Sequence, residues 1–306
     1  MNTADPIAIS KIATFNGHKD CIYAIENGIN NDFYSAGSDG MVVAWNLERP
    51  DNGELVANVA NSVYALHFLA KNNQLLVGQN HEGIYQIDLA SKSILKSSKI
   101  TNSQIFDIKT TGEFILIATG DGQLIVLSIH DLTVITKIQV AEKSVRVIAI
   151  NPISPSFAIG LSDFSIRIFS SIDFREIHQL QDHKNSVFSL AYSPDGSFLL
   201  SGSRDAAIKI WQSATQYQLK HSIPAHLFAV NDIAYNAKGN LFATASMDKT
   251  IKIWNSENFR LLKVIDKARY QSHFTSVNKL LWLNDSQLLS ASDDKKIFLW
   301  NIEINE

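Results

Sequence analysis

The sequence predicts an all-β fold, a seven-bladed β-propeller built from four-stranded antiparallel blades. The first observation is an eleven-residue pattern that occurs four times, at Ser35–Trp45, Ser201–Trp211, Thr244–Trp254 and Ser290–Trp300. In each copy a hydroxyl residue lies four positions before an aspartate, and a tryptophan lies six positions after it. The second observation is the period, because a unit of about 40–45 residues is typical of a propeller blade, which cannot bury its faces alone.

The period extends through the whole chain. Aligning every unit on its last strand gives seven anchor residues, which lie 40 to 46 positions apart: Trp45, Ile87, Leu127, Phe169, Trp211, Trp254 and Trp300. A repeat that closes on itself can accommodate 306 residues in one domain. Residues 1–306 are therefore predicted to form a single propeller.

Each unit contains short segments of alternating polarity that are separated by turn signals. In the fifth unit the apolar opening Ser186–Ser193 is followed by the turn Pro194–Gly196, a second strand, a tight turn at the aspartate and a third strand that ends at the anchor. Such period-2 patterning with regular turns is typical of β-structure. A continuous apolar stretch such as Phe114–Ala118 fits a strand packed between neighbouring blades.

These units resemble the WD-repeat family over nearly the whole chain. The resemblance implies that the sequence repeat is offset from the blade by one strand, so that each blade receives its outermost strand from the start of the following repeat. The seventh anchor is followed by only a few residues, and the last blade therefore needs its outer strand from elsewhere. We expect the apolar segment Ile7–Phe15 to supply this strand, which would close the ring and remove an exposed edge.

The resemblance also implies a buried hydrogen-bonded tetrad in four of the units, formed by a loop histidine, the hydroxyl residue, the aspartate and the tryptophan. The tetrads are His18, Ser35, Asp39 and Trp45; His183, Ser201, Asp205 and Trp211; His226, Thr244, Asp248 and Trp254; and His273, Ser290, Asp294 and Trp300. The chemistry is consistent, because an imidazole can donate to a carboxylate, and buried hydroxyl and indole groups need partners.

Units 2, 3 and 4 depart from this pattern. They lack the tryptophan and the loop histidine, and Val77, Ile117 and Ile159 occupy the hydroxyl position. Unit 2 has His81 where the aspartate is expected, whereas units 3 and 4 keep Asp121 and Asp163. We expect these three blades to rely on apolar packing instead.

The repeated Ser, His and Asp residues are interpreted as structural, and the chain is not predicted to be an enzyme. A catalytic triad needs one exposed nucleophile beside an oxyanion site, whereas this chain has four similar sets around a ring. The sequence contains no G-x-S-x-G elbow, H-E-x-x-H motif or Walker-type loop. The other histidines show no metal-ligand spacing, so no cofactor or metal is expected: His67, His81, His130, His178 and His221.

Composition restricts the kinds of partner. A net charge of −3 with 19% charged residues gives no electrostatic footprint for nucleic acid. The single cysteine, Cys21, cannot form an internal disulfide, no secretory signal starts the sequence, and no apolar run is long enough to span a membrane. We expect a cytoplasmic, monomeric protein with protein or peptide partners, and neither nucleic acid nor a membrane as a partner.

Function is expected at exposed positions that the framework leaves free, on the face that carries the histidine loops, here called the top face. One position, directly after the apolar residue that opens each inner strand, is predicted to form the rim of the central channel: Tyr23, Tyr64, Phe106, Arg146, Phe188, Asn231 and Asn278. A second position, directly before the tight-turn aspartate, includes Arg204, Met247 and Asp293. Aromatic residues and arginine most often supply the binding energy of protein interfaces. Arg146 and Arg204 could bind an acidic or phosphorylated segment through paired hydrogen bonds, and Asp293 would favour a basic residue of the partner.

The sequence thus predicts a non-catalytic interaction platform that binds proteins or peptides on its top face. Three alternatives stay open. In the first, the rim aromatics only fill the channel mouth and pack on one another. In the second, the channel holds the site of an enzyme or a small-ligand binder, which needs clustered carboxylates or metal ligands. In the third, the chain is a constitutive subunit of a larger complex. Against the last, the outer segment Ala90–Thr101 reads as solvated.

Overall fold

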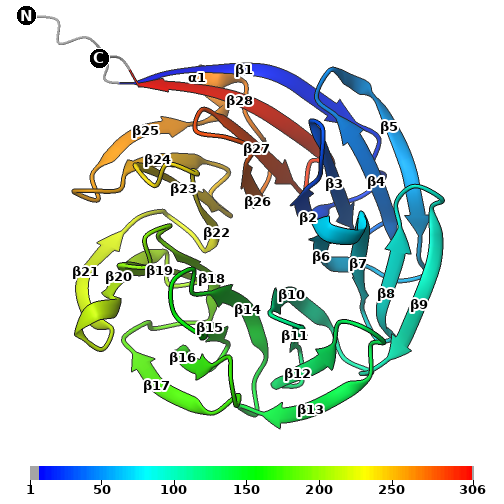
Figure 1. Ribbon diagram of the computed structural model, residues 1–306. Coiled ribbons are helices and arrows are strands. Elements are labelled where there is room, and N and C mark those ends of the chain that lie inside the picture. The colour runs from blue at the N-terminus through cyan, green and yellow to red at the C-terminus, as the bar shows by residue number, and fades with distance from the viewer. Residues whose placement is uncertain (1–6, 305–306) are drawn as a thin grey trace, which may run out of the picture.

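The computed structural model describes residues 7–304, which form one ring of seven four-stranded antiparallel sheets (Figure 1). The prediction of a seven-bladed propeller is confirmed. The strands of the first three blades are β2 (Ile22–Asn27), β3 (Asp32–Gly37), β4 (Met41–Asn46) and β5 (Arg49–Asn58); β6 (Val63–Leu69), β7 (Gln74–Gln79), β8 (Gly83–Asp88) and β9 (Ser93–Lys99); and β10 (Ile105–Thr111), β11 (Phe114–Thr119), β12 (Gln123–Ser128) and β13 (Val134–Gln139).

Blades 4 to 6 follow the same plan, from the innermost strand outward. They consist of β14 (Val145–Ile150), β15 (Ser156–Leu161), β16 (Ser165–Ser170) and β17 (Glu176–Gln181); β18 (Val187–Tyr192), β19 (Phe198–Ser203), β20 (Ala207–Gln212) and β21 (Gln218–Pro224); and β22 (Val230–Tyr235), β23 (Leu241–Ser246), β24 (Ile251–Asn255) and β25 (Leu261–Ile265). The helical elements are short: α1 (Lys267–Tyr270) and 3-10 turns at Ala70–Asn72 and Ser213–Thr215. Within residues 7–304 no helix is long and apolar enough to cross a membrane.

Blade 7 closes the ring with a strand from the other end of the chain. It contains β26 (Val277–Trp282), β27 (Gln287–Ser292) and β28 (Lys296–Ile304), and β1 (Ile7–Asn16) forms its outer strand. The register runs antiparallel from Ile7 opposite Ile304 to Asn16 opposite Lys296, and Figure 1 shows the two strands side by side. Closure by the amino-terminal segment is therefore confirmed, with the strand one residue longer than expected.

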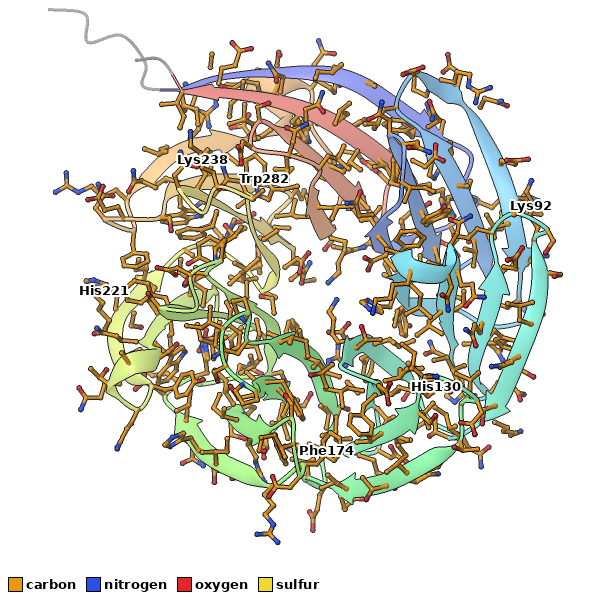
Figure 2. All side chains as sticks on the ribbon, in the orientation of Figure 1. Lys92, His130, Phe174, His221, Lys238 and Trp282 are labelled. Atoms are coloured by element: carbon orange, nitrogen blue, oxygen red, sulfur yellow. The ribbon has the colours of Figure 1, made fainter. Side chains whose placement is uncertain are left out.

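Apolar residues between neighbouring blades form the core. Where blade 7 meets blade 1, Phe15, Phe33 and Trp45 are buried together with Leu289 and Leu299. The rings of Phe15 and Phe33 lie edge to face, with centroids 4.9 Å apart, which is a favoured aromatic geometry. The outer strands, in contrast, are solvated, as His221 on β21 illustrates, and Lys92, in the turn before the outer strand β9, is exposed as well (Figure 2).

All four expected tetrads are present, and in each one a chain of hydrogen bonds joins the indole, the hydroxyl, the imidazole and the carboxylate in that order. In blade 7 the Trp300 indole N–H donates to Ser290 Oγ (2.8 Å), which lies 2.9 Å from His273 Nε2, and His273 Nδ1 lies 2.9 Å from Asp294. Because an ionised carboxylate can only accept, Nδ1 donates to Asp294, and in an imidazole with one N–H the other nitrogen, Nε2, accepts from the Ser290 O–H. Ser290 Oγ in turn accepts from the indole, so every buried polar group of the tetrad has a partner.

Blades 2 to 4 use apolar packing at the hydroxyl position, as expected. Val77, Ile117 and Ile159 are fully buried. The aspartates that remain make local contacts within their turns: Asp121 accepts from Thr119 Oγ1 (2.5 Å), and Asp163 accepts from Ser165 Oγ (2.6 Å). In blades 3 and 4 the aspartate thus stabilises its own turn although no histidine is present.

Candidate functional site

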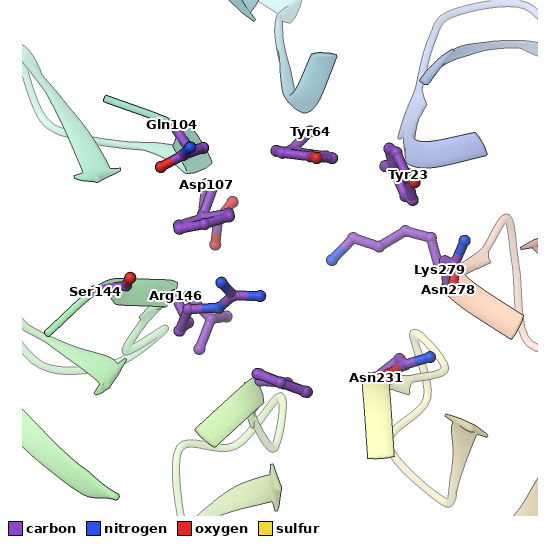
Figure 3. A pocket seen from close by; sticks show the side chains of 12 residues that line it. Tyr23, Tyr64, Gln104, Asp107, Ser144, Arg146, Asn231, Asn278 and Lys279 are labelled. Atoms are coloured by element: carbon purple, nitrogen blue, oxygen red, sulfur yellow. The ribbon is translucent and has the colours of Figure 1, made fainter. Parts of the chain in front are cut away.

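The candidate site is the top mouth of the central channel, where a cavity of about 630 Å³ opens. All seven residues predicted at the rim line this cavity, together with Gln104, Asp107, Ser144, Val147 and Lys279 (Figure 3). The seven rim residues come from the innermost strand of each blade, and Figure 1 shows these strands around the central axis. The structure thus brings the predicted rim together around one opening.

A β-bulge places each rim side chain. In blade 1 the β2–β3 register passes from Ile22 opposite Gly37 to Ala24 opposite Ala36, so Tyr23 has no partner across the ladder. The inner strand of every other blade shifts register at the same point. A bulge leaves one residue unpaired and re-aims its side chain. The rim is therefore a ring of seven bulge residues, one from each blade.

The rim side chains of blades 1 to 5 form a continuous run, here called the aromatic run: Tyr23, Tyr64, Phe106, Arg146 and Phe188. Tyr23 and Tyr64 meet edge to face at 4.7 Å, and Tyr64 stacks on Phe106 at 5.8 Å between centroids. The Arg146 guanidinium lies 3.9 Å from the Phe106 centroid and 4.9 Å from that of Phe188. These are favourable aromatic and cation–π geometries.

The aromatic run is both packed and accessible. Its members contact one another, as the alternative of a plugged channel mouth requires, but all five stay only half-buried. Burial, with the nearby charge of Arg204, lowers the pKa of Arg146 from its ordinary value, and Tyr64 opposes this shift. The exposed faces of these rings and of the guanidinium are thus presented to the cavity.

The rim residues of blades 6 and 7 are tied into bonds between blades. Asn231 Nδ2 donates to Ser276 Oγ and to the Val277 carbonyl, both at 2.9 Å. Asn278 Nδ2 donates to the Ile22 carbonyl (3.0 Å) and to Asp293 Oδ1 (2.7 Å). Part of the binding capacity that the sequence assigned to Asn231, Asn278 and Asp293 is therefore used within the ring.

Arg204 and Met247 lie outside the cavity lining, on the turns of blades 5 and 6, and both are exposed. Their backbone N–H groups donate to the Ser186 and Ala229 carbonyls of the preceding loops (2.9 and 3.0 Å). The predicted site thus divides into a rim around the cavity and exposed residues on the turns beside it.

Sequence reasoning missed the charged wall below the rim. Asp107 Oδ2 accepts from the Ile148 backbone N–H of the next blade (2.8 Å). Asp232 accepts from Leu280 N–H (2.8 Å) and from Lys279 Nζ (3.1 Å), again across a blade boundary. Both aspartates directly follow a rim residue in the sequence, and this position was the signal from which they could have been predicted. Burial raises the pKa of Glu26, another carboxyl near this wall, and Lys109 opposes the shift.

These carboxylates do not assemble a metal site. Within the described span no group of three or more His, Cys, Asp or Glu side chains has an arrangement that could hold a metal ion. Asp107 and Asp232 instead accept hydrogen bonds from backbone N–H groups of the neighbouring blade, so they connect adjacent blades.

His67 is expected to make the ring sensitive to moderate acid. Its Nε2 lies 2.8 Å from Thr110 Oγ1 of blade 3, and burial, reinforced by Lys109, lowers its pKa to about 4. The unfolded chain, with a histidine pKa of about 6.5, binds the proton first, so stability falls as the pH drops from 6.5 toward 4. In His67→Gln, we expect the loss in unfolding free energy between pH 7 and pH 5 to be smaller by about 2 kcal/mol.

Urea unfolding at the two pH values measures this difference, and His221→Gln, on the exposed outer strand β21, is the matched control. If His67→Gln and the unaltered chain lost the same free energy on acidification, His67 would not be the titrating group.

Comparison with known proteins agrees with this architecture. The family described as "WD domain, G-beta repeat" matches residues 9–46, 174–212, 217–255 and 266–301. The chain is 23% identical over 215 residues to Protein groucho of Drosophila melanogaster and 23% identical over 235 residues to Striatin of Homo sapiens. Each match covers 66% of this chain but only 29% of the relative. The chain thus spans less than a third of the length of these relatives.

A solved structure, the WD40 β-propeller domain of Doa1, superimposes with a TM-score of 0.85 over 96% of this chain and 97% of that one, at 17% identity. This likeness concerns the fold. The four matched segments contain the tetrads, whereas residues 47–173, which lie between the first two matched segments, form strands of the same kind of four-stranded sheet. The chain therefore belongs to the WD-repeat β-propeller family.

Proposed function

We propose that this chain is a non-catalytic interaction platform that binds partner proteins or peptides on its top face. The observation that carries the proposal is the aromatic run around the cavity of about 630 Å³. Half-exposed tyrosine, phenylalanine and arginine side chains are the types that supply most interface energy. A closed ring holds them in place before binding, so little conformational freedom is lost.

The state of the tetrads supports the non-catalytic part of the proposal. Ser35, Ser201 and Ser290 are fully buried, and each is engaged by an indole and an imidazole. A nucleophile must reach its substrate, and these hydroxyl groups face the interior of their blades. The repeated Ser, His and Asp residues thus fit a structural role. The net charge of −3 favours protein over nucleic acid as the partner of a monomeric chain.

Affinity capture tests the proposal directly. In the variant Arg146→Ala/Phe188→Ala we expect the captured amount of each specific partner to fall about tenfold, because two adjoining members of the aromatic run are removed. Quantitative mass spectrometry of the captured proteins measures the loss. The matched control is Ile172→Ala/Arg175→Ala, on an exposed turn of blade 4 away from the cavity, which should keep the partners.

The melting temperature of each variant is measured alongside. Partners that persist on the rim variant would contradict the proposal. A melting temperature that collapses in step with capture would also contradict it, since the rim side chains would then act as core.

A further inference from the structure

The three most exposed apolar side chains of the top face all lie on blade 6. Leu227 is 84% exposed, Phe228 58% and Met247 57%. Leu227 and Phe228 lie in the loop between β21 and β22, and Met247 lies in the turn between β23 and β24. A protein surface rarely presents such neighbours without a binding role.

The two segments are held side by side by the framework of blade 6. Met247 N–H donates to the Ala229 carbonyl (3.0 Å), Ser246 Oγ donates to the Phe228 carbonyl (3.3 Å), and Leu227 N–H donates to the Asp248 carboxylate (3.0 Å). The tetrad of the blade thus fixes the backbone while the three apolar side chains point away from it. At the equivalent loop position blades 1 and 5 have Lys19 and Lys184, and blade 7 has Phe274, which is 50% exposed and whose ring centroid lies 5.5 Å from Lys267 Nζ. Blade 6 is the one of these four blades in which two further apolar side chains, Phe228 and Met247, are exposed beside that position.

Arg204 lies on the top turn of blade 5, the blade that precedes this apolar surface along the ring. In the ring, the top turn of one blade lies against the loop of the next, as Ser62 Oγ bound to the Ser38 carbonyl and Ser144 Oγ bound to the Gly120 carbonyl show. The turn of blade 5, which carries Arg204, therefore adjoins the loop of Phe228. We call Arg204, Leu227, Phe228 and Met247 the blade 5–6 patch.

The charges around the patch favour an anion. Lys184, Arg204 and Lys249 are exposed, and no carboxylate within residues 7–304 forms an ion pair with any of them. Of the carboxylates in this sector, Asp182 forms an ion pair with Lys209, whereas Asp205 and Asp248 accept hydrogen bonds from His183 and His226 and keep their negative charges. The three exposed cations outnumber these two charges. On the neighbouring blade 4 the rim adds Arg146, which lines the cavity and stays partly exposed.

We propose that the blade 5–6 patch binds a linear peptide segment in which apolar side chains stand next to anionic ones. The apolar side chains pack on Leu227, Phe228 and Met247, and the anionic groups bind Arg204 and Arg146. Arginine suits carboxylate and phosphate alike, through paired charge-assisted hydrogen bonds. This inference rests on the proposed top-face function and names its partner chemistry. The aromatic run ends at Phe188 on blade 5, the blade that also carries Arg204 of the patch.

A synthetic nonapeptide library, randomised over the standard amino acids and phosphoserine, is screened against the full chain. We expect the selected peptides to combine neighbouring apolar residues with anionic ones. Their Kd, measured by fluorescence anisotropy, should rise about tenfold or more in Arg204→Glu and in Leu227→Ser/Phe228→Ser. The controls Arg175→Glu and Ile172→Ser, equally exposed but on blade 4, should leave the Kd unchanged. Exchanging phosphoserine for glutamate in a selected peptide tells phosphate from carboxylate recognition.

Selected peptides that are neutral or basic, or that bind the patch variants as well as the unaltered chain, would overturn the inference. Peptides that depend on Arg146 and Phe188 but not on the patch would overturn it while leaving the proposed function intact, and peptides that depend on neither would defeat both. Labelled oligothymidylate that binds with the same dependence on Arg204 and Phe228 would assign the patch to nucleic acid instead. Circular dichroism confirms that each variant is folded.

Discussion

A chain that begins at Gly17, and therefore lacks β1, is expected to lose its cooperative unfolding transition. β1 contributes the outer strand of blade 7, and its ends bury Ile7 and Phe15, each only 1% exposed. Deleting one large buried side chain costs about 2–5 kcal/mol, against a total stability of about 5–15 kcal/mol for a typical domain. Without β1 the edge of β28 is also unpaired and open to association. Thermal unfolding and size-exclusion chromatography with light scattering measure both effects.

Point substitutions within β1 separate loss of packing from loss of the strand. Phe15→Ala should reduce the free energy of unfolding by about 3–5 kcal/mol, whereas Ile12→Ala, at a position 51% exposed, should change it by less than about 0.5 kcal/mol. A synthetic peptide with the sequence of residues 7–16 should restore the transition of the shortened chain. A shortened chain that melts like the full one would show that the ring does not need this closure.

His273→Ala is expected to destabilise the protein by about 3–5 kcal/mol, because it leaves a buried carboxylate without its partner. The side chains of His273 and Asp294 are both fully buried, and the imidazole also stacks on Phe298 with 4.2 Å between centroids. Burial raises the pKa of Asp294, but the hydrogen bond and charge of His273, with backbone N–H groups, outweigh this effect and lower it. Urea unfolding at pH 7 measures the loss.

His221→Ala is the control, since His221 lies on the exposed outer strand β21 (Figure 2) and should change stability by about 0.5 kcal/mol or less. The double variant His273→Ala/Asp294→Ala should be less destabilised than the sum of the two single variants, because the second substitution removes the stranded charge. A loss below about 1 kcal/mol in His273→Ala would mean that the tetrad is not a coupled unit.

The repeated residues made the framework predictable from the sequence. A tetrad such as His18, Ser35, Asp39 and Trp45 has fixed spacing, so four copies define the strand order and the face on which the loops lie. The rim was also predictable, since its residues follow a recognisable apolar position. The physical reason for the rim, a bulge at this residue in each blade, was not visible in the sequence.

Contacts between blades were not predictable. Asp232 reads as one polar residue in a strand, and its partners Lys279 and Leu280 lie in the next repeat, at a distance that only the closed ring defines. Asn278 likewise binds the Ile22 carbonyl at the other end of the chain. The exposure of Leu227 and Phe228 was missed for a different reason, because two apolar residues beside a buried histidine look like core until the loop is seen.

The bulges have a consequence for how such a ring can change over evolutionary time. Tyr23 sits at a point where the ladder skips a residue, so exchanging its side chain alters no cross-strand partner. The same holds for Phe106 and Arg146 in their blades. New specificities can therefore be acquired one blade at a time while the scaffold is inherited intact.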